Sequence, residues 1–321
     1  MPEILINKAE EAPKNIAIGM LLAALGAIAF SGKAIIVKLA YRYQVDAVTL
    51  IMYRMLFALP LFMAMAWWGT YRQGGGVRVA LTRRDWIGIV GLGFSGYYLA
   101  SFLDFAGLQY ISASLERLIL YITPTLVMGL GWLLYGRTIR RVQAWGMGIS
   151  YLGVLLVFGQ EVRLDGGDVA LGALLVFLSA VSYAIYLSYS GELVQRLGSL
   201  RLVGMATTVA CLLCIFQYVV VRPLSWNALQ VAPEVIWLSL LNATLCTAVP
   251  VLLVMMAIER IGAGATAQTG MVGPMSTILM GVLILGEPFT MWVGLGTVLV
   301  IAGILVFSQS KRVRHSEKGN L

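Results

Sequence analysis

Long apolar stretches recur along the chain and constrain its fold more than any other feature. A helix needs about 20 mostly apolar residues to cross the hydrocarbon core of a bilayer. Ten segments reach this length, at residues 16–40, 46–68, 86–108, 112–135, 141–160, 169–190, 201–221, 235–258, 262–285 and 290–309. The sequence therefore predicts an all-α integral membrane protein with ten transmembrane helices.

Composition supports a lipid environment. Hydrophobic residues make up 60% of the 321 residues and charged residues only 12%, with a mean hydropathy of +0.86. So little polar material cannot cover a water-facing surface. Cys211, Cys214 and Cys246 lie in apolar segments, which disfavours a disulfide framework and a Cys-x-x-Cys redox or metal site. The one histidine, His315, lies in the basic tail, so we expect no imidazole catalysis, metal or cofactor.

Lysine and arginine are unequally divided between the two ends of the segments. If the N-terminus is cytoplasmic, the inner side holds sixteen of them: Lys8, Lys14, Arg72, Arg78, Arg83, Arg84, Arg137, Arg140, Arg141, Arg196, Arg201, Arg260, Lys311, Arg312, Arg314 and Lys318. The outer side holds four: Lys38, Arg42, Arg163 and Arg222. This bias predicts a multi-pass protein of the plasma (inner) membrane with both termini cytoplasmic. It explains the net charge of +8 without a nucleic-acid partner.

The chain also contains an internal duplication. An ungapped shift of 150 positions aligns residues 107–160 with 257–310; it pairs Ile111 with Ile261, Pro124 with Pro274, Gly131 with Gly281, Gly136 with Gly286, Gly146 with Gly296 and Gly153 with Gly303. A shift of 153 likewise pairs Ala17, Gly19 and Leu21 with Ala170, Gly172 and Leu174. We expect two repeats, at 16–160 and 168–310. Each has five spans, an odd number, so the second copy should be inverted and the two should surround a central cavity, as in carriers.

The end of the second copy, LGEPFTMWVGLGTVLVIAGILV (285–306), resembles the last part of EamA-type permeases in the drug/metabolite transporter superfamily. Lys38 and Arg54 fall where that family carries a lysine after its first helix and an arginine in its second. Two features depart from the pattern: residues 30–32 read Phe-Ser-Gly instead of Trp-Gly, and residues 136–137 read Gly-Arg instead of Gly-Glu. The resemblance implies secondary transport of small metabolites, often export of amino acids or related compounds.

Five ionisable residues fall in the outer half of the first four segments: Lys33, Arg54, Asp104, Glu116 and Arg117. At 1.5 Å per residue, each lies within about 12 Å of the outer end of its helix. Charged groups at this depth pair with one another or line water. They therefore form either a structural ion-pair network, with Asp104 facing Arg117 and Glu116 facing Lys33 or Arg54, or the outer mouth of a pathway that binds a carboxylate or carries a proton.

The inverted copy carries no such charges. Its register places Thr266 and Ala267 opposite Glu116 and Arg117, Tyr186 opposite Lys33, and about Thr207 opposite Arg54. We therefore expect an ionic outer gate and an apolar or hydroxylic inner gate.

Prolines and uncharged polar residues provide weaker signals. Pro124 and Pro274 occupy matching positions and are candidate hinges, because proline breaks the hydrogen-bond ladder of a helix. Candidate substrate-lining residues are Tyr97, Tyr98, Tyr183, Asn242, Thr244 and Gln268. Such groups also hydrogen-bond between helices without any role in binding.

A secondary carrier accounts best for these features, with a small molecule, the lipid bilayer and a coupling proton as partners. An enzyme is not expected, because no nucleophile–base pair or metal set is present in the apolar segments. The alternatives are an exchanger of phosphorylated or nucleotide-linked metabolites, and a channel or scramblase. The sequence is compatible with a monomer or a homodimer.

Overall fold

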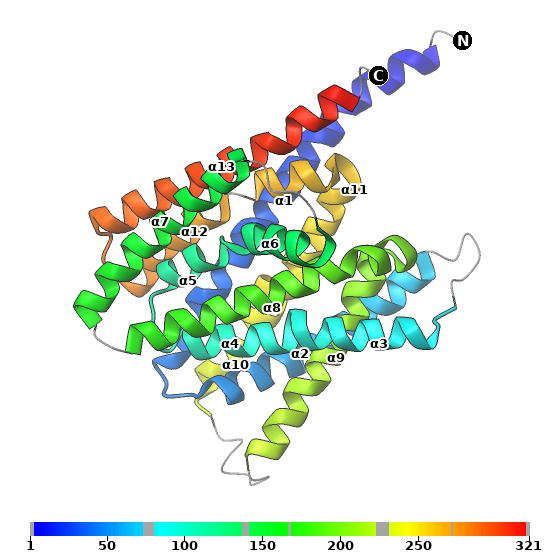
Figure 1. Cartoon of the computed structure of the whole chain (residues 1–321). Coiled ribbons are helices and arrows are strands. Elements are labelled where there is room, and N and C mark those ends of the chain that lie inside the picture. The colour runs from blue at the N-terminus through cyan, green and yellow to red at the C-terminus, as the bar shows by residue number, and fades with distance from the viewer. Residues whose placement is uncertain are drawn as a thin grey trace.

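The computed structural model describes residues 3–72, 80–136, 141–165, 168–222, 231–270 and 272–318, where all regular structure is helical (Figure 1). The first copy contains α1 (Glu3–Tyr41), α2 (Ala47–Arg72), α3 (Arg83–Leu92), a π-helix (Gly93–Leu99), α4 (Ala100–Gly107), α5 (Ala113–Leu120), α6 (Thr123–Tyr135) and α7 (Arg141–Asp165). The second contains α8 (Asp168–Leu197), α9 (Ser199–Val221), α10 (Pro233–Ala243), a π-helix (Thr244–Ala248), α11 (Val249–Thr269), α12 (Val272–Met280), a π-helix (Gly281–Leu285) and α13 (Met291–Lys318). The all-α fold is confirmed.

Most of the expected spans are present at full length. Among the described residues, eight helical segments are long and apolar enough to cross a membrane: Ile16–Tyr41, Ala47–Tyr71, Arg83–Gly107, Ala113–Leu133, Ala144–Arg163, Asp168–Gly191, Ser199–Val221 and Pro233–Ala257. The last two expected spans, 262–285 and 290–309, contain the shorter apolar helices Met275–Leu285 and Met291–Gly303. The chain is a multi-pass integral membrane protein. Both termini lie at one end of the molecule (Figure 1), which we call the terminus side; the opposite end is the far side.

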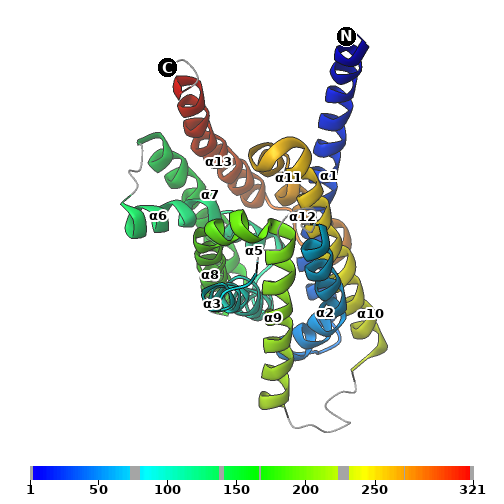
Figure 2. The ribbon, with the colours of Figure 1, turned by 90° about the vertical axis from the view of Figure 1, so that its right-hand side faces the viewer.

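One boundary differs from the prediction. We expected a connection at residues 259–261, but α11 is helical from Val249 through Thr269. Figures 1 and 2 show that α11 bends along its length, so the chain changes direction within the helix. Residues 257–269 contain no proline, and charged residues alone do not end a helix.

Helices α2 and α9, which are equivalent in the two copies, pack against each other closely. A Cβ atom added at Gly69 would lie 2.7 Å from the backbone nitrogen of Arg201, and one added at Gly204 would lie 2.6 Å from that of Ala66. The contacts descend along α2 as they ascend along α9, so the two helices are antiparallel. Equivalent helices that run in opposite directions require one copy to be inverted relative to the other.

The equivalent helices α7 and α13 show the same relation. Gly153 lies against Gly296, and Gly146 lies against Gly303. The shift of 150 positions that aligns the copies converts one of these pairs into the other, as a two-fold axis requires. The glycine spacing thus allows two backbones to touch, as is common where helices cross in membranes.

Both copies interrupt their fourth span at matching positions. In the first copy, turn residues 121 and 122 separate α5 from α6, and Pro124 lies in the first turn of α6. In the second copy, α11 ends before Gly270, and Pro274 lies near the start of α12. Proline is accepted in the first turn because its missing N–H group would have no helical partner there.

The third span of each copy contains a matching π-helix, at Gly93–Leu99 and at Thr244–Ala248. A π-helix leaves backbone groups less regularly paired and often marks a functional position. The irregular parts of both copies therefore lie in their third and fourth spans.

Far-side contacts also tie the copies together. Asp46 precedes α2 and accepts a hydrogen bond from the backbone of Val48, and its Oδ1 lies 2.9 Å from Nη2 of Arg222 at the end of α9. Partial burial raises the pKa of Asp46, but hydrogen bonds from Thr49 and Arg222 outweigh that effect and hold the pKa below its usual value. The carboxylate is thus ionised at neutral pH and links the far-side ends of α2 and α9.

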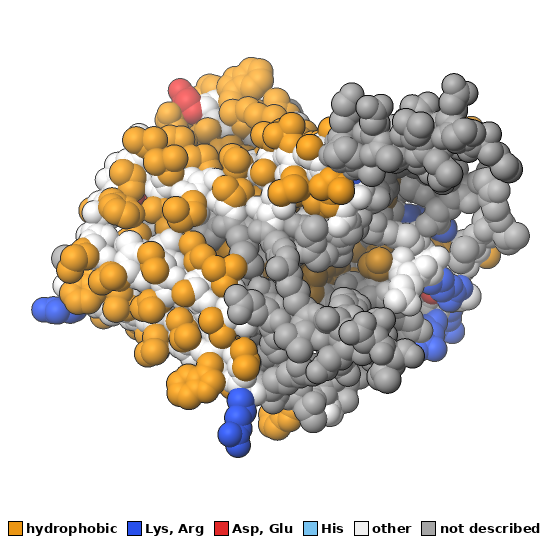
Figure 3. Space-filling view, turned by 90° about the horizontal axis from the view of Figure 1, so that it is seen from above, with side chains coloured by type: hydrophobic (Ala, Val, Ile, Leu, Met, Phe, Trp, Pro, Cys, Tyr) orange, Lys and Arg blue, Asp and Glu red, His pale blue; other side chains and the backbone are white. Residues whose placement is uncertain are grey.

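The outer surface suits lipid contact. Figure 3 shows apolar side chains over much of the described part of one face, with lysine and arginine near its edges. Trp67, Trp68 and Trp86 are exposed near the terminus side, where α2 ends and α3 begins. Tryptophan favours the interface between lipid and water, so these residues mark that boundary.

Candidate functional site

Three of the predicted ionisable residues meet in one buried cluster. Lys33 of α1 places its Nζ atom 2.5 Å from Oδ2 of Asp104 in α4 and 3.4 Å from Oε1 of Glu116 in α5. The Lys33 side chain is 15% exposed, that of Asp104 3% and that of Glu116 0%. We call these three residues the ionic cluster, because one ammonium group faces two carboxylates inside the membrane-spanning region.

The two carboxylates of the ionic cluster are incompletely satisfied. Among the described residues, Oδ1 of Asp104 and both carboxylate oxygens of Glu116 accept no hydrogen bond. Within the same part of the chain, Lys33 is the cation that lies within 4 Å of them. Buried ionised groups need both opposite charge and hydrogen bonds. The cluster therefore favours an added proton or an additional cationic group.

Arg117, next to Glu116 in α5, points elsewhere. Its Nη2 atom donates a hydrogen bond to Oγ of Ser31 at 2.9 Å, and its guanidinium lies 5.7 Å from the ring centre of Tyr121. The prediction that Asp104 faces Arg117 was wrong, because Asp104 forms its ion pair with Lys33 instead. The Nε atom of Arg117 is buried without a hydrogen-bond partner in the described part of the chain.

The breaks in the fourth spans of the two copies meet beside Arg117. Tyr121, at the first break, donates a hydrogen bond from its hydroxyl to the backbone oxygen of Gly270, at the second break, at 3.1 Å. Ser31 lies 2.8 Å from the backbone oxygen of Gly273. A Cβ atom added at Gly273 would lie 3.0 Å from both Arg117 Nη2 and the Tyr121 hydroxyl. We call this contact the break junction; it joins the inverted copies through the backbone carbonyls of Gly270 and Gly273.

The start of α5 is held by two carboxylates from distant parts of the chain. Glu287, just before α13, accepts hydrogen bonds from the backbone nitrogens of Ala113 at 2.7 Å and Ser114 at 3.3 Å. Glu161 of α7 accepts from the backbone nitrogen and hydroxyl of Ser112. Carboxylates favour a helix N-terminus, where backbone N–H groups lack partners. These contacts hold the start of α5, which carries Glu116 of the ionic cluster one turn further along.

Arg54 lies outside the ionic cluster. Its Nε and Nη2 atoms donate to Oγ1 of Thr247 at 3.2 and 3.1 Å, and its guanidinium lies 5.0 Å from the ring centre of Phe105. No carboxylate of a described residue lies within 4 Å of it; of the two expected partners of Glu116, the structure shows Lys33 and not Arg54. Asn242, two residues before the π-helix that contains Thr247, is 1% exposed, and its amide atoms have no partner among the described residues.

The remaining predicted residues lie apart from the ionic cluster. The hydroxyl groups of Tyr97 and Tyr186 lie 3.4 Å apart, and the ring of Tyr183 stacks on that of Tyr186. The ring of Tyr98 packs against Phe94. Thr244 donates its hydroxyl proton to a carbonyl of its own helix. The side chain of Gln268 lies outside the described residues.

That the second copy forms an apolar or hydroxylic gate stays a prediction. Thr266, Tyr186 and Thr207, the counterparts of charged residues in the first copy, are buried, and none of them carries a charge. Lys33 follows Ser31 in α1 and Glu116 precedes Tyr121 in α5, so the ionic cluster lies on the far side of the break junction.

Sequence reasoning missed Ser31, Tyr121 and Glu287. Ser31 departs from the Trp-Gly pattern, which was noted without a role, and Tyr121 is an ordinary aromatic residue in an apolar segment. Glu287 belongs to the Gly-Glu pair, which indicated a family but not a contact. Its partner is the backbone of Ala113, 174 residues away in sequence, and backbone donors leave no pattern in a sequence.

Removing the Glu287 carboxylate should open the far side more often. We expect Glu287→Ala to increase the open population about fivefold, because a carboxylate at a helix N-terminus contributes about 1 kcal/mol. The readout is alkylation of Ala113→Cys by a membrane-impermeant maleimide, with Cys211, Cys214 and Cys246 replaced by alanine. Ala113 is fully buried in this structure.

Glu234, the exposed acidic residue in the first turn of α10, is the control. Glu234→Ala should leave the labelling rate unchanged. Equal rates in the two variants would show that Glu287 does not hold the far side closed.

Comparison with known proteins identifies related membrane proteins. A model of the EamA-like transporter family matches residues 17–159 and again residues 170–309. The uncharacterized transporter YcbK of Bacillus subtilis (strain 168) is 31% identical over 291 residues, which cover 87% of this chain and 90% of that protein. An uncharacterized transporter of Archaeoglobus fulgidus is 23% identical over 290 residues, which cover 88% of this chain and 95% of that protein.

A solved structure has a similar backbone. Its printed description is "Crystal structure of protein", and it aligns with a TM-score of 0.58 over 90% of this chain and 94% of the other. The identity is 18%, so the likeness concerns the fold alone.

Proposed function

Because the chain belongs to the EamA-like transporter family, we propose that it exports amino acids or related small metabolites by alternating access. It is a membrane transporter and not an enzyme. The observation that carries the proposal is the position of the ionic cluster beside the break junction. Charged groups able to bind a substrate thus adjoin the contact that has to rearrange when the inverted copies move.

The chemistry of the site suits a zwitterion. Arg117 keeps a free Nε donor for a substrate carboxylate, and Glu116, whose Oε1 faces Lys33 at 3.4 Å, keeps Oε2 for a substrate ammonium group. In the substrate-free state a proton on Glu116 balances the charge of the ionic cluster. Substrate and proton then compete for Glu116, which couples transport to the proton gradient.

The break junction supplies the moving part. Discontinuous helices at the middle of the membrane are characteristic of carriers built from inverted repeats. Breaking the Tyr121–Gly270 and Ser31–Gly273 contacts releases one fourth span from the other, and releasing Glu287 from α5 opens the far side. Pro124 and Pro274 allow each fourth span to bend at its break without losing helical hydrogen bonds.

The proposed orientation has both termini in the cytoplasm of a plasma (inner) membrane. The far side, closed by Glu287, then faces outward. Release of substrate from the ionic cluster to that side corresponds to export.

Export is tested in two steps. Cells that overproduce the protein should survive toxic amino acid analogues better than cells that produce the Arg117→Ala variant. The control variant Arg163→Ala removes an exposed charge at the end of α7 and should protect cells as well as the wild type. Counterflow in proteoliposomes with the radiolabelled parent amino acid then distinguishes a carrier, which saturates, from a channel.

Glu116→Gln should retain counterflow but lose transport driven by a pH gradient, because the amide cannot exchange a proton. Linear, non-saturating flux through the wild-type protein would overturn the carrier proposal. Gradient-driven transport by Glu116→Gln would overturn the assignment of the proton to Glu116.

A further inference from the structure

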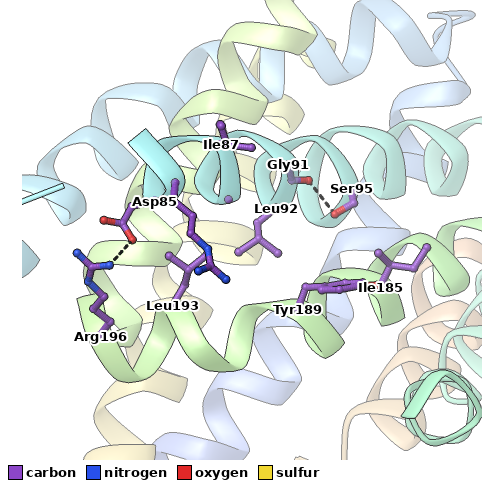
Figure 4. A pocket seen from close by; sticks show the side chains of 11 residues that line it. Asp85, Ile87, Gly91, Leu92, Ser95, Ile185, Tyr189, Leu193 and Arg196 are labelled. Atoms are coloured by element: carbon purple, nitrogen blue, oxygen red, sulfur yellow. Dashed lines mark hydrogen bonds and ion pairs between the residues drawn. The ribbon is translucent and has the colours of Figure 1, made fainter. Parts of the chain in front are cut away.

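We propose that the groove between α3 and α8 on the terminus side binds an anionic phospholipid. The groove encloses about 490 Å³ and lies apart from the ionic cluster. Figure 4 shows Leu92 of α3, Tyr189 and Leu193 of α8 lying between the two helices, with the Asp85–Arg196 ion pair at one end. Nothing in the proposed transport step uses these residues.

The mouth of the groove carries unbalanced positive charge. Asp85 Oδ2 accepts hydrogen bonds from the backbone nitrogen and hydroxyl of Thr82, and its Oδ1 lies 3.0 Å from Nη1 of Arg196. Asp85 is thereby fully engaged, and it neutralises Arg196. Arg84 also lines the groove, and no carboxylate of a described residue lies within 4 Å of its guanidinium. An anion that reaches the mouth meets Arg84 and the remaining donors of Arg196.

The rest of the groove is apolar and exposed. Ile87 is 67% exposed and Tyr189 50%, and a Cβ atom added at Gly91 would have no neighbour within 4 Å. The Ser95 hydroxyl is satisfied by the backbone oxygen of Gly91. A vestibule for a hydrophilic solute would be lined by polar groups instead. Exposed apolar walls at this level of a spanning helix face hydrocarbon.

The length of the groove matches one leaflet. Its lining residues on α3 and the following π-helix extend from Arg84 to Ser95, which is about 16 Å at the rise of a helix. One leaflet of the hydrocarbon core is about 15 Å thick. Trp86, exposed beside the mouth, marks the interface with water. A phospholipid with its phosphate at Arg84 and Arg196 therefore extends one acyl chain along Ile87, Tyr189 and Ile185. Basic pockets between spanning helices are suited to such headgroups.

Native mass spectrometry of the purified full-length protein tests the site. Phosphatidylglycerol and phosphatidylcholine with identical acyl chains are added separately, and we expect tighter binding of phosphatidylglycerol. Arg84→Ala should weaken the binding of phosphatidylglycerol about fivefold, which corresponds to about 1 kcal/mol per basic residue. The binding of phosphatidylcholine should not change. Arg83→Ala removes the same charge from the neighbouring position, which does not line the groove, and should have no effect.

A second pair of variants tests the acyl-chain part of the groove. Gly91→Leu fills this part of the groove and should weaken the binding of both lipids. Gly148→Leu, at an equally open position of α7, should leave the binding of both unchanged. Glycerol phosphate, which has no acyl chain, should not displace the bound lipid; displacement would mean that the site binds a free phosphate. Equal binding of the two lipids by the wild type, or equal effects of Arg84→Ala and Arg83→Ala, would overturn the proposal.

Discussion

Replacing Lys33 with methionine should destabilise the protein more than any other single change in the ionic cluster. The substitution removes the ammonium group that faces both Asp104 and Glu116 and leaves two buried carboxylates without a cation within 4 Å among the described residues. Breaking a buried ion pair by removing one partner costs about 3–5 kcal/mol. Thermal unfolding of the purified protein in detergent measures the loss.

Substitutions of Lys33 and its partners should differ in their loss of stability, in an order that nonspecific destabilisation would not produce. Asp104→Asn should cost less than Lys33→Met, because Lys33 keeps Glu116 at 3.4 Å. Combining the two substitutions should restore part of the stability, since the remaining carboxyl group can then take up a proton. Arg163→Met, at an exposed position, should change the unfolding free energy by about 0.5 kcal/mol at most. A double variant less stable than Lys33→Met would show that the cluster does not act as a unit.

Gly303→Val should separate the crossing of α7 and α13. A Cβ atom at this position would lie 2.5 Å from the backbone oxygen of Gly146 and 2.7 Å from the backbone nitrogen of Ser150. Backbone atoms cannot rotate away as a side chain can, so the helices have to move apart. Overpacking of this kind costs about 1–3 kcal/mol, which the same thermal unfolding assay detects.

Gly148→Val provides the matched control for this crossing. Gly148 also lies on α7, but a Cβ atom added there has no neighbour within 4 Å. The valine side chain should therefore extend toward lipid at almost no cost. Equal destabilisation by the two substitutions would mean that helix propensity, and not the helix crossing, determines the result.

The sequence predicted the spans and the inversion well, because both depend on features that are local or repeated. Apolar length marks a span regardless of what packs against it. The shift of 150 positions that pairs Gly153 with Gly303 also places each of them in the crossing of α7 and α13. Because each repeat has an odd number of spans, the second repeat starts on the opposite side of the membrane and is therefore inverted.

Contacts within the site were predicted less well. The depth of each charge along its helix placed Lys33, Asp104 and Glu116 in one layer, and the structure joins them. Depth does not fix rotation about the helix axis, so Arg117 was assigned to Asp104 when it bonds Ser31 instead. Arg54 was assigned to the same layer but faces Thr247 in a π-helix, a distortion that sequence periodicity does not predict.

The glycine contacts between equivalent helices limit how the two halves of the molecule can travel. At Gly69 and Gly204 the backbones of α2 and α9 already touch, and the same is true at Gly153 and Gly303 for α7 and α13. Neither pair has room to approach further, and separating them would expose bare peptide groups to acyl chains. If the protein works by the alternating access proposed above, we expect a tilt about these fixed points, in which one end of the molecule closes as the other opens.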